Sequence, residues 1–121
     1  MSRILVIDDD DQIRAMLQQV LQREEFQVVD APDGKEGIRL FREEAADLVI
    51  TDIIMPDKEG IETIMELRRD FPEVKIIAIS GGGRVEPSQY LGLAKKLGAQ
   101  VTLIKPFERE ELLAAVHGLL E

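Results

Sequence analysis

The chain has 121 residues, of which 45% are hydrophobic and none is cysteine, and its formal net charge is -9. This length suits a single domain with its own core, and the lack of cysteine excludes disulfides and thiolate metal sites. The negative charge argues against direct binding of nucleic acid, because the phosphates would be repelled, and no apolar stretch approaches the roughly 18 to 20 residues of a membrane span.

The N-terminal residues Met1-Ser2-Arg3 lead directly into the first predicted element, so we expect a cytoplasmic protein without a signal peptide. In chain order, the hydrophobic pattern predicts a strand at residues 4–7, a helix with Ile13, Leu17, Val20 and Leu21 on its inner face, a strand at 26–29, a helix with Ile38, Phe41 and Ala45 facing inward, and a strand at 48–51. It then predicts a helix with Ile61, Ile64, Met65 and Leu67 facing inward, a strand at 74–79, a helix marked by Tyr90, Leu91, Ala94 and Leu97, a strand at 101–104, and a last helix with the stripe Leu112, Leu113, Val116 and Leu119.

Local signals mark the ends of several predicted helices. Asp10 or Asp11 can cap the first helix, because a carboxylate accepts hydrogen bonds from the exposed N–H groups of the first turn. Phe71-Pro72 ends the third helix, since the residue before a proline avoids helical geometry. Gly98 fits the C-terminal cap of the fourth helix.

The alternation of five strands with five helices predicts the fold class. Such a pattern indicates an α/β fold, in which a parallel sheet is covered by helices on both faces and the crossovers are right-handed. We see no internal repeat and no interdomain linker, so we expect one domain over residues 1–121.

Reactive polar residues follow four of the predicted strands. Asp8 and Asp9 come directly after the first strand, Asp52 after the third, Ser80 after the fourth and Lys105 after the fifth. In open α/β sheets ligands bind outside the carboxyl ends of the strands. If these strands are neighbours, three carboxylates, a hydroxyl and an ammonium meet at one edge, a combination that suits a magnesium ion and a transferred phosphoryl group.

The three carboxylates predict a magnesium site. Carboxylates that are crowded together repel each other, and a divalent cation removes this conflict. Magnesium usually combines one or two carboxylates with waters and a phosphate, so Asp9 and Asp52 can be ligands while Asp8 holds a coordinated water. The backbone carbonyl of Ile54 could add a further oxygen.

Each of these residues taken alone also has a simpler explanation. Asp8 and Asp9 could belong to the acidic start of a helix, and Asp52 could be an ordinary turn residue. Ser80 could end a strand before a loose glycine loop, and Lys105 could be a surface lysine whose stem covers apolar surface.

Together, the residue types, their order and their strand-end positions resemble a bacterial response-regulator receiver domain of a two-component system. The matching segments are Ile4-Leu5-Val6-Ile7-Asp8-Asp9, Asp47-Leu48-Val49-Ile50-Thr51-Asp52-Ile53-Ile54-Met55-Pro56 and Ile104-Lys105-Pro106-Phe107. The resemblance spans essentially the whole chain. It implies a doubly wound (βα)5 fold whose five-stranded parallel sheet has the strand order 2-1-3-4-5.

The resemblance implies that Asp52 is the phosphoacceptor, a nucleophile that takes a phosphoryl group from the phosphohistidine of a sensor kinase. Asp8, Asp9 and Asp52 would bind Mg²⁺, with Mn²⁺ as an alternative, and the backbone carbonyl of Ile54 would complete the protein ligands.

The resemblance also gives roles to Ser80 and Lys105. Ser80 would move to hydrogen-bond the new phosphoryl oxygens, and Lys105 would pair first with Asp52 and then with the phosphoryl group. The bond before Pro106 would be cis. These roles agree with the chemistry, because a loose phosphoryl-transfer transition state needs positioning and charge neutralisation more than covalent help.

Three positions depart from the family's pattern. Thr102 stands where an aromatic residue is usual, three residues before the lysine, which puts the family's aromatic rotamer switch in doubt. Ile54, two residues after Asp52, and Gly82, two residues after Ser80, carry no group that could orient water toward an acyl phosphate. We therefore expect slow self-dephosphorylation.

We interpret the chain as a stand-alone receiver without an output domain, a signalling phosphoacceptor and not an enzyme that acts on other substrates. Its upstream partner would be a sensor histidine kinase or a histidine phosphotransfer protein. A downstream protein would bind the face formed by the fourth helix, the fifth strand and the fifth helix, where Tyr90 and Thr102 lie.

Alternative functions come from other classes. A phosphorelay intermediate would pass the phosphoryl group to another histidine, and the sequence does not separate this role from that of an output effector. A metal-dependent aspartyl phosphatase would normally carry a second acid at Ile54, and a flavin-binding protein would need a hydroxyl-rich loop where Asp8 and Asp9 stand. The lone histidine, His117, lies away from every strand end, so we expect a surface or boundary residue there.

Overall fold

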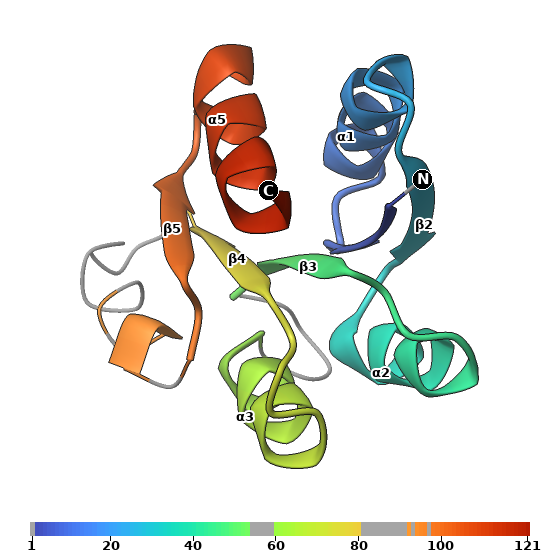
Figure 1. The fold of residues 1–121 in the computed structure, drawn as a ribbon, viewed down its shortest axis with the longest axis vertical. Coiled ribbons are helices and arrows are strands. Elements are labelled where there is room, and N and C mark those ends of the chain that lie inside the picture. The colour runs from blue at the N-terminus through green and yellow to red at the C-terminus, as the bar shows by residue number, and fades with distance from the viewer. Residues whose placement is uncertain (1, 54–59, 81–91, 93, 97) are drawn as a thin grey trace.

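The computed structural model describes residues 2–53, 60–80, 92, 94–96 and 98–121 (Figure 1). Its strands are β1 (Arg3–Ile7), β2 (Gln27–Ala31), β3 (Leu48–Asp52), β4 (Ile76–Ser80) and β5 (Val101–Ile104), and its helices are α1 (Asp11–Arg23), α2 (Gly34–Glu43), α3 (Gly60–Asp70) and α5 (Arg109–Leu120). The strands form one parallel sheet in the order β2-β1-β3-β4-β5. The predicted α/β class and the strand order implied by the resemblance are therefore confirmed.

Helices cover both faces of the sheet. Figure 1 shows α1 and α5 on one side and α2 and α3 on the other. Side chains of α1 and α5 share one hydrophobic cluster, represented by Leu17 and Val116, and those of α2 and α3 share a second, represented by Ile38 and Ile64. The molecule thus has two cores separated by the sheet, as a doubly wound fold requires.

The central strands are buried on both faces because most of their side chains are apolar, whichever face of the sheet they point to. Every residue of β3 and β4 is buried, and only Arg3 of β1 is partly exposed. At the edge of the sheet, β5 is less covered, and the side chain of Ile104 is 52% exposed. Continuous burial is typical of parallel strands between two helical layers.

The predicted helix boundaries hold where capping chemistry is specific. Asp10 is the N-cap of α1, and its carboxylate accepts hydrogen bonds from the N–H groups of Gln12 and Ile13. Helix α3 ends at Asp70, directly before Phe71-Pro72. Gly98 has a φ of 128°, a left-handed conformation that glycine adopts without a steric penalty.

The prediction of an inward-facing side chain is wrong for two residues, Ala45 and Met65. Helix α2 ends at Glu43, so Ala45 lies beyond it and is exposed. Met65 is 51% exposed. The buried residues of α3 are Gly60, Thr63, Ile64 and Leu67, so Thr63 lies on the inner face of the helix and Met65 does not.

Two strands are displaced from their predicted positions. Strand β2 occupies Gln27–Ala31 and not residues 26–29, because Phe26 lies before the strand and packs against the cluster shared by α1 and α5. Strand β4 begins at Ile76 and includes Ser80, while Val74 closes a turn through its N–H bond to the carbonyl of Phe71.

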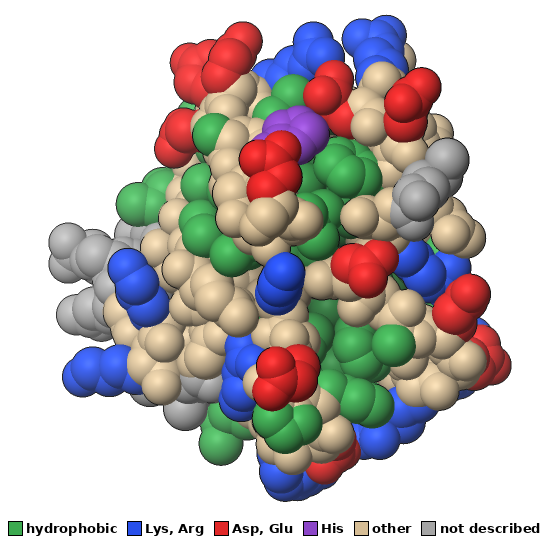
Figure 2. All heavy atoms as spheres, in the orientation of Figure 1, with side chains coloured by type: hydrophobic (Ala, Val, Ile, Leu, Met, Phe, Trp, Pro, Cys, Tyr) green, Lys and Arg blue, Asp and Glu red, His purple; other side chains and the backbone are tan. Residues whose placement is uncertain are grey.

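The predicted fourth helix falls mostly outside the described residues, and Tyr90, Leu91 and Leu97 are among those not described. Gly92 and residues 94–96 are helical, and Ala94 is buried in the cluster shared by α2 and α3. None of the helices that the structure describes is long and apolar enough to cross a membrane. Figure 2 shows acidic, basic and hydrophobic side chains interspersed on one face of the molecule.

Candidate functional site

The site lies at the carboxyl ends of four strands. Asp52 and Ser80 are the last residues of β3 and β4, so both strands end one residue later than predicted. Asp8 follows β1, and Lys105 follows β5. The strand order places the ends of β1, β3, β4 and β5 side by side, and this brings together residues that are far apart in the sequence.

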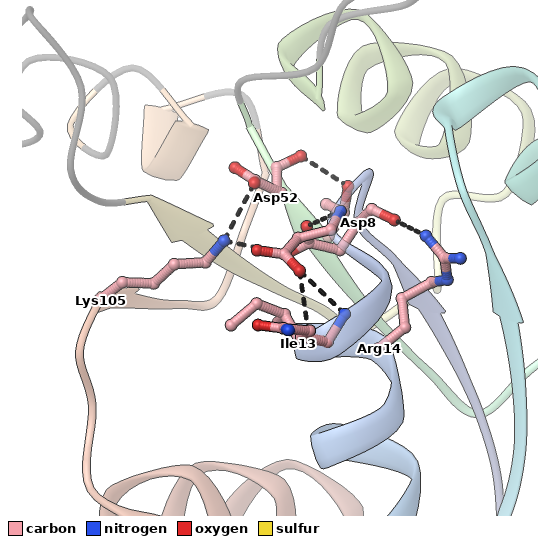
Figure 3. Close-up of polar contacts among 8 residues, drawn as sticks. Asp8, Ile13, Arg14, Asp52 and Lys105 are labelled. Carbon is pink, nitrogen blue, oxygen red and sulfur yellow. Dashed lines mark hydrogen bonds and ion pairs between the residues drawn. The ribbon is translucent and has the colours of Figure 1, made fainter.

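Lys105 bridges two of the acids. Its Nζ lies 3.0 Å from Oδ2 of Asp8 and 3.1 Å from Oδ2 of Asp52 (Figure 3). Its backbone N–H donates to the carbonyl oxygen of Ser80 at 2.8 Å, which ties the segment after β5 to the end of β4. The Lys105–Pro106 peptide bond is cis, as the resemblance implied.

The three acids form one cluster. Asp8, Asp9 and Asp52 each offer a carboxylate oxygen, and these oxygens lie within 4.8 Å of one another. Asp8 and Asp52 are buried, whereas Asp9 is exposed. The side chain of Asp52 is 9% exposed, so it is not sealed from solvent. Hard oxygen donors at this spacing fit the ligand preference of magnesium.

The electrostatics of the cluster favour a bound cation. Burial raises the pKa of Asp8, and the neighbouring negative charge of Asp52 adds to this rise, while the N–H group of Asp10 and the ammonium of Lys105 oppose it. Burial acts to lower the pKa of Lys105, but the carboxylates of Asp52 and Asp8 outweigh it and raise that pKa. The ammonium alone therefore leaves the site acidic, and a divalent ion would supply the missing positive charge.

Ser80 is completely buried beside the site. Its Oγ has no hydrogen-bond partner among the residues that the structure describes. A buried hydroxyl without a partner costs free energy, so such groups are usually paired or reserved for a ligand. Ser80 adjoins Ile79, whose partner across the sheet is Asp52, and its own partner in β5 is Ile104.

Asp8 is held by both its main chain and its side chain. Its N–H donates to the carbonyl oxygen of Ala31 at 3.1 Å, and its Oδ1 accepts from the N–H of Asp10 at 2.9 Å. Its carbonyl oxygen accepts from Nη1 of Arg14 at 2.6 Å (Figure 3). Arg14 was not among the residues predicted from the sequence. Its one local signal is the i, i+3 spacing from Asp11, with which it forms an ion pair.

Gly60, the first residue of α3, touches the backbone of the site. A Cβ atom at this position would lie 2.1 Å from the carbonyl oxygen of Asp52 and 2.3 Å from Cα of Ile53. The N–H of Gly60 also donates to the carbonyl oxygen of Ile53 at 3.2 Å. The hydrophobic pattern of the sequence gives no signal for this close approach.

Four further residues named in the sequence analysis lie outside this cluster or outside the described part of the chain. Ile54 and Gly82 lie outside the described residues, so their expected roles remain predictions. Thr102 is half-buried in β5. His117 is a boundary residue, as expected. Its Nε2 lies 3.4 Å from Oε1 of Glu24, and the centroid of its ring lies 5.7 Å from that of Phe26.

Comparisons with known proteins agree with this geometry. Residues 4–117 match the family described as the response regulator receiver domain. The chain is 36% identical over 120 residues to the transcriptional regulatory protein CpxR of Klebsiella pneumoniae, a match that covers 99% of the chain and 50% of that protein. The chain thus spans about half the length of this relative.

Solved structures show the same fold along the whole chain. A response regulator receiver domain protein of Clostridium thermocellum has a TM-score of 0.91 and 31% identity, and the match covers 99% of this chain and 94% of that one. The response regulator TrrA of Thermotoga maritima, solved in complex with Mg²⁺ and BeF, has a TM-score of 0.88 and 34% identity, with 99% and 100% covered. With its sheet order, its acidic cluster and a family match over almost its full length, the chain belongs to the response regulator receiver domain family.

Proposed function

We propose that this receiver is a phosphoacceptor, in which Asp52 takes a phosphoryl group from the phosphohistidine of a sensor kinase in a Mg²⁺-dependent reaction. The observation that carries the proposal is the position of the Lys105 ammonium, 3.1 Å from Asp52 and 3.0 Å from Asp8, beside a cluster of three carboxylates. This arrangement combines a nucleophile, a fixed positive charge and a set of metal ligands at one sheet edge.

The residues fit the metal that the reaction needs. Asp9 and Asp52 would bind Mg²⁺ directly, Asp8 would hold one of its waters, and the carbonyl of Ile54, which lies outside the described residues, would add an oxygen. When bound, Mg²⁺ neutralises negative charge on the carboxylates and on the phosphoryl oxygens. The relative TrrA was solved with Mg²⁺ and BeF, which supports this choice of metal.

The transfer step uses the carboxylate of Asp52 as the nucleophile. One carboxylate oxygen forms a bond to phosphorus while the phosphorus–nitrogen bond to the donor imidazole breaks, and the bonding electrons leave with the imidazole nitrogen. Lys105 holds its positive charge within hydrogen-bond distance of Asp52 and would stabilise negative charge on the equatorial oxygens. Positioning and charge are the main contributions that this chemistry asks of a protein.

Ser80 would report the new phosphoryl group to the rest of the molecule. Its buried Oγ lacks a partner among the described residues, so a phosphoryl oxygen on Asp52 offers it a hydrogen bond. A movement of Ser80 toward that oxygen would shift the end of β4 and the backbone of Lys105, to which it is bonded. A phosphorylation event then becomes a change of surface.

The changed surface would bind a downstream partner protein through β5, α5 and the helical residues before them, with Thr102 on this face. We further propose that residues 1–121 act as one receiver unit and that signalling takes place in the cytoplasm, where sensor kinases present their phosphohistidine. A phosphorelay would use the same site in the opposite direction, with transfer onward to another histidine.

Intact mass spectrometry after incubation with acetyl phosphate and Mg²⁺ tests the proposal. The wild type should gain the mass of one phosphoryl group, and Asp52→Asn should gain none. Asp47→Asn is a matched control, because Asp47 is an exposed aspartate that accepts from the N–H of Arg3 at 2.8 Å and takes no part in the site. Equal incorporation in Asp52→Asn and the wild type, or incorporation that persists after Mg²⁺ is chelated, would contradict it.

A further inference from the structure

We infer that Arg14 is a positioning residue for the metal site, which it serves through the main chain of Asp8 and Asp9 without touching the metal ligands' carboxylates. The inference rests on the proposed function, because it concerns the affinity of the same acidic cluster for Mg²⁺. Arg14 lies in the first turns of α1, next to the end of β1 (Figure 3).

The guanidinium of Arg14 joins three elements. Its Nη1 donates to the carbonyl oxygen of Asp8 at 2.6 Å, and its Nε donates to Oδ2 of Asp30, near the end of β2, at 3.1 Å. Its Nη2 forms an ion pair with Asp11 at the start of α1. The side chain of Arg14 is only 14% exposed, whereas Asp30 is 36% and Asp11 is 86% exposed. The bond to the main chain of Asp8 is therefore better shielded from water and from salt than the exposed ion pair with Asp11.

The contact to Asp8 acts on two carboxylates at once. The carbonyl of Asp8 belongs to the planar peptide unit that joins Asp8 to Asp9, and this unit sets the direction in which the next side chain leaves the backbone. The N–H of Asp8 is already fixed by the carbonyl of Ala31. Arg14 therefore supplies the second anchor, and together the two hold the segment from which both acids reach the site.

Only an arginine can make this set of contacts. A guanidinium is a planar fork with several donors in fixed directions, whereas a lysine ammonium is a point charge on a flexible stem. The charge of Arg14, taken alone, would repel a metal ion. For Arg14→Ala, a positioning role thus predicts weaker Mg²⁺ binding and a purely electrostatic role predicts tighter binding. For Arg14→Lys, which keeps the charge, the two roles predict weaker and unchanged binding.

Isothermal titration with MgCl2 separates the two roles. We expect Arg14→Lys and Arg14→Ala each to bind Mg²⁺ about 10-fold more weakly than the wild type, in the range measured when groups behind a metal ligand are lost. Asp30→Ala, which leaves Arg14 in place but removes one of its anchors, should weaken binding by a smaller factor.

Arg39→Lys is the matched control. Arg39 also makes several ion pairs, with Glu36 and Glu43, but these partners lie on its own helix α2 and not at the site. Its Mg²⁺ affinity should equal that of the wild type. Circular dichroism and urea unfolding of each variant establish the folded fraction, so that the affinity is compared only between folded proteins.

The outcomes distinguish this inference from the proposed function. A wild type that binds no Mg²⁺ overturns both. A wild type that binds Mg²⁺, with Arg14→Lys binding equally well, overturns the inference and leaves the proposed function standing. Tighter binding by Arg14→Ala shows that only charge matters and also overturns it. If neither Arg14 variant folds, unchanged affinity in Asp30→Ala overturns it. Affinity that stays weakened in high salt, where the lost charge of Asp30 is screened, supports it, and weakening that high salt abolishes overturns it.

Discussion

Burial disfavours the charged form of the Asp8 carboxyl group. Its side chain is 2% exposed, and burial together with Asp52 raises its pKa above the ordinary carboxyl value. The ammonium of Lys105 contacts both acids, while its bond to Ser80 is made by the backbone N–H alone. The site is therefore an acidic cluster with one ammonium, and a bound cation would reduce the repulsion between its carboxylates.

The lifetime of the phosphorylated state is also a matter of single residues. Ile54 and Gly82 carry no group that could orient an attacking water, so we expect slow loss of phosphate from wild-type Asp52 at neutral pH. Ile54→Asn and Gly82→Glu should each shorten the half-life of the phosphorylated protein, because each adds a polar side chain. Intact mass measured over time gives the half-life. Rapid loss in the wild type that neither substitution changes would contradict the prediction.

The site residues could be predicted from the sequence to the extent that strand ends reveal them. Asp8, Asp52 and Lys105 each follow or end a short apolar strand, and parallel strands place such ends at one edge. Arg14 could not be found in this way. Its bond to the carbonyl of Asp8 depends on how α1 leaves the end of β1, which no local pattern encodes.

At the scale of elements, the start of α3 packs directly on the end of β3. Gly60→Ala would place a methyl group against the carbonyl of Asp52, where the nearest atoms belong to the backbone and cannot rotate away. We expect the free energy of unfolding to fall by about 1–3 kcal/mol. The backbone of Asp52 would have to move to make room for the methyl group. Phosphorylation of Asp52 by acetyl phosphate should therefore also slow, because its carboxylate would move relative to Lys105.

Gly118→Ala is the control for that substitution. Gly118 lies within α5, and a Cβ there meets no atom within 4 Å. Because alanine favours the helix over glycine, the free energy of unfolding should rise by about 0.5–1 kcal/mol, and phosphorylation should be unaffected. Urea unfolding and intact mass measure both quantities. A Gly60→Ala protein as stable and as readily phosphorylated as the wild type would refute the proposed packing role.

Helices α2 and α3 are joined by ion pairs whose effect depends on pH. Hydrogen bonds from Arg69 and Arg42 hold the pKa of Asp70 below its usual range, and Arg42 also pairs with Glu66. A lowered carboxyl pKa in the folded state stabilises the protein at pH values above the ordinary pKa of 3.8, and this contribution is lost as the pH falls below that value.

Asp70→Asn should therefore lower the free energy of unfolding near neutral pH and have less effect at about pH 3. The change is expected to be small because the pair is exposed to solvent, and added salt should reduce it further. Urea unfolding of both proteins at the two pH values measures the difference. A difference that grows as the pH falls would contradict the assignment.

The ends of helices were predictable where a single capping residue or proline sets them. The positions that depend on packing between elements were harder to predict. The N-cap at Asp10 and the stop before Phe71-Pro72 follow from local chemistry. The position of β2 depends on Phe26 packing against α1 and α5, and the exposure of Met65 depends on Thr63 taking the inner face of α3. Both are tertiary effects that override the hydrophobic pattern.

At the scale of the whole molecule, the site exists only when the sheet is complete. Lys105 is separated from Asp8 by 97 positions and from Asp52 by 53, and only the order β1-β3-β4-β5 brings them together. An unfolded chain therefore has no comparable metal site, and a ligand that binds only the folded state stabilises it.

Magnesium should accordingly stabilise the whole domain. At a concentration 100 times its dissociation constant, we expect Mg²⁺ to raise the free energy of unfolding by about 2.7 kcal/mol. Chelation of the metal should reverse the effect, and Asp9→Asn should reduce it, because one exposed ligand of the cluster is lost. Thermal or urea unfolding with and without Mg²⁺ measures this. Equal stabilisation of Asp9→Asn and the wild type would place the metal elsewhere.

Asp52 is the proposed phosphoacceptor, and chemical trapping identifies the modified residue by its position in the chain. Borohydride reduces an aspartyl phosphate to homoserine, so the protein is treated with acetyl phosphate and Mg²⁺, reduced, digested and sequenced by mass spectrometry. We expect homoserine at position 52 and at no other aspartate. Homoserine at another position, or none in protein that has gained a phosphoryl group, would contradict it.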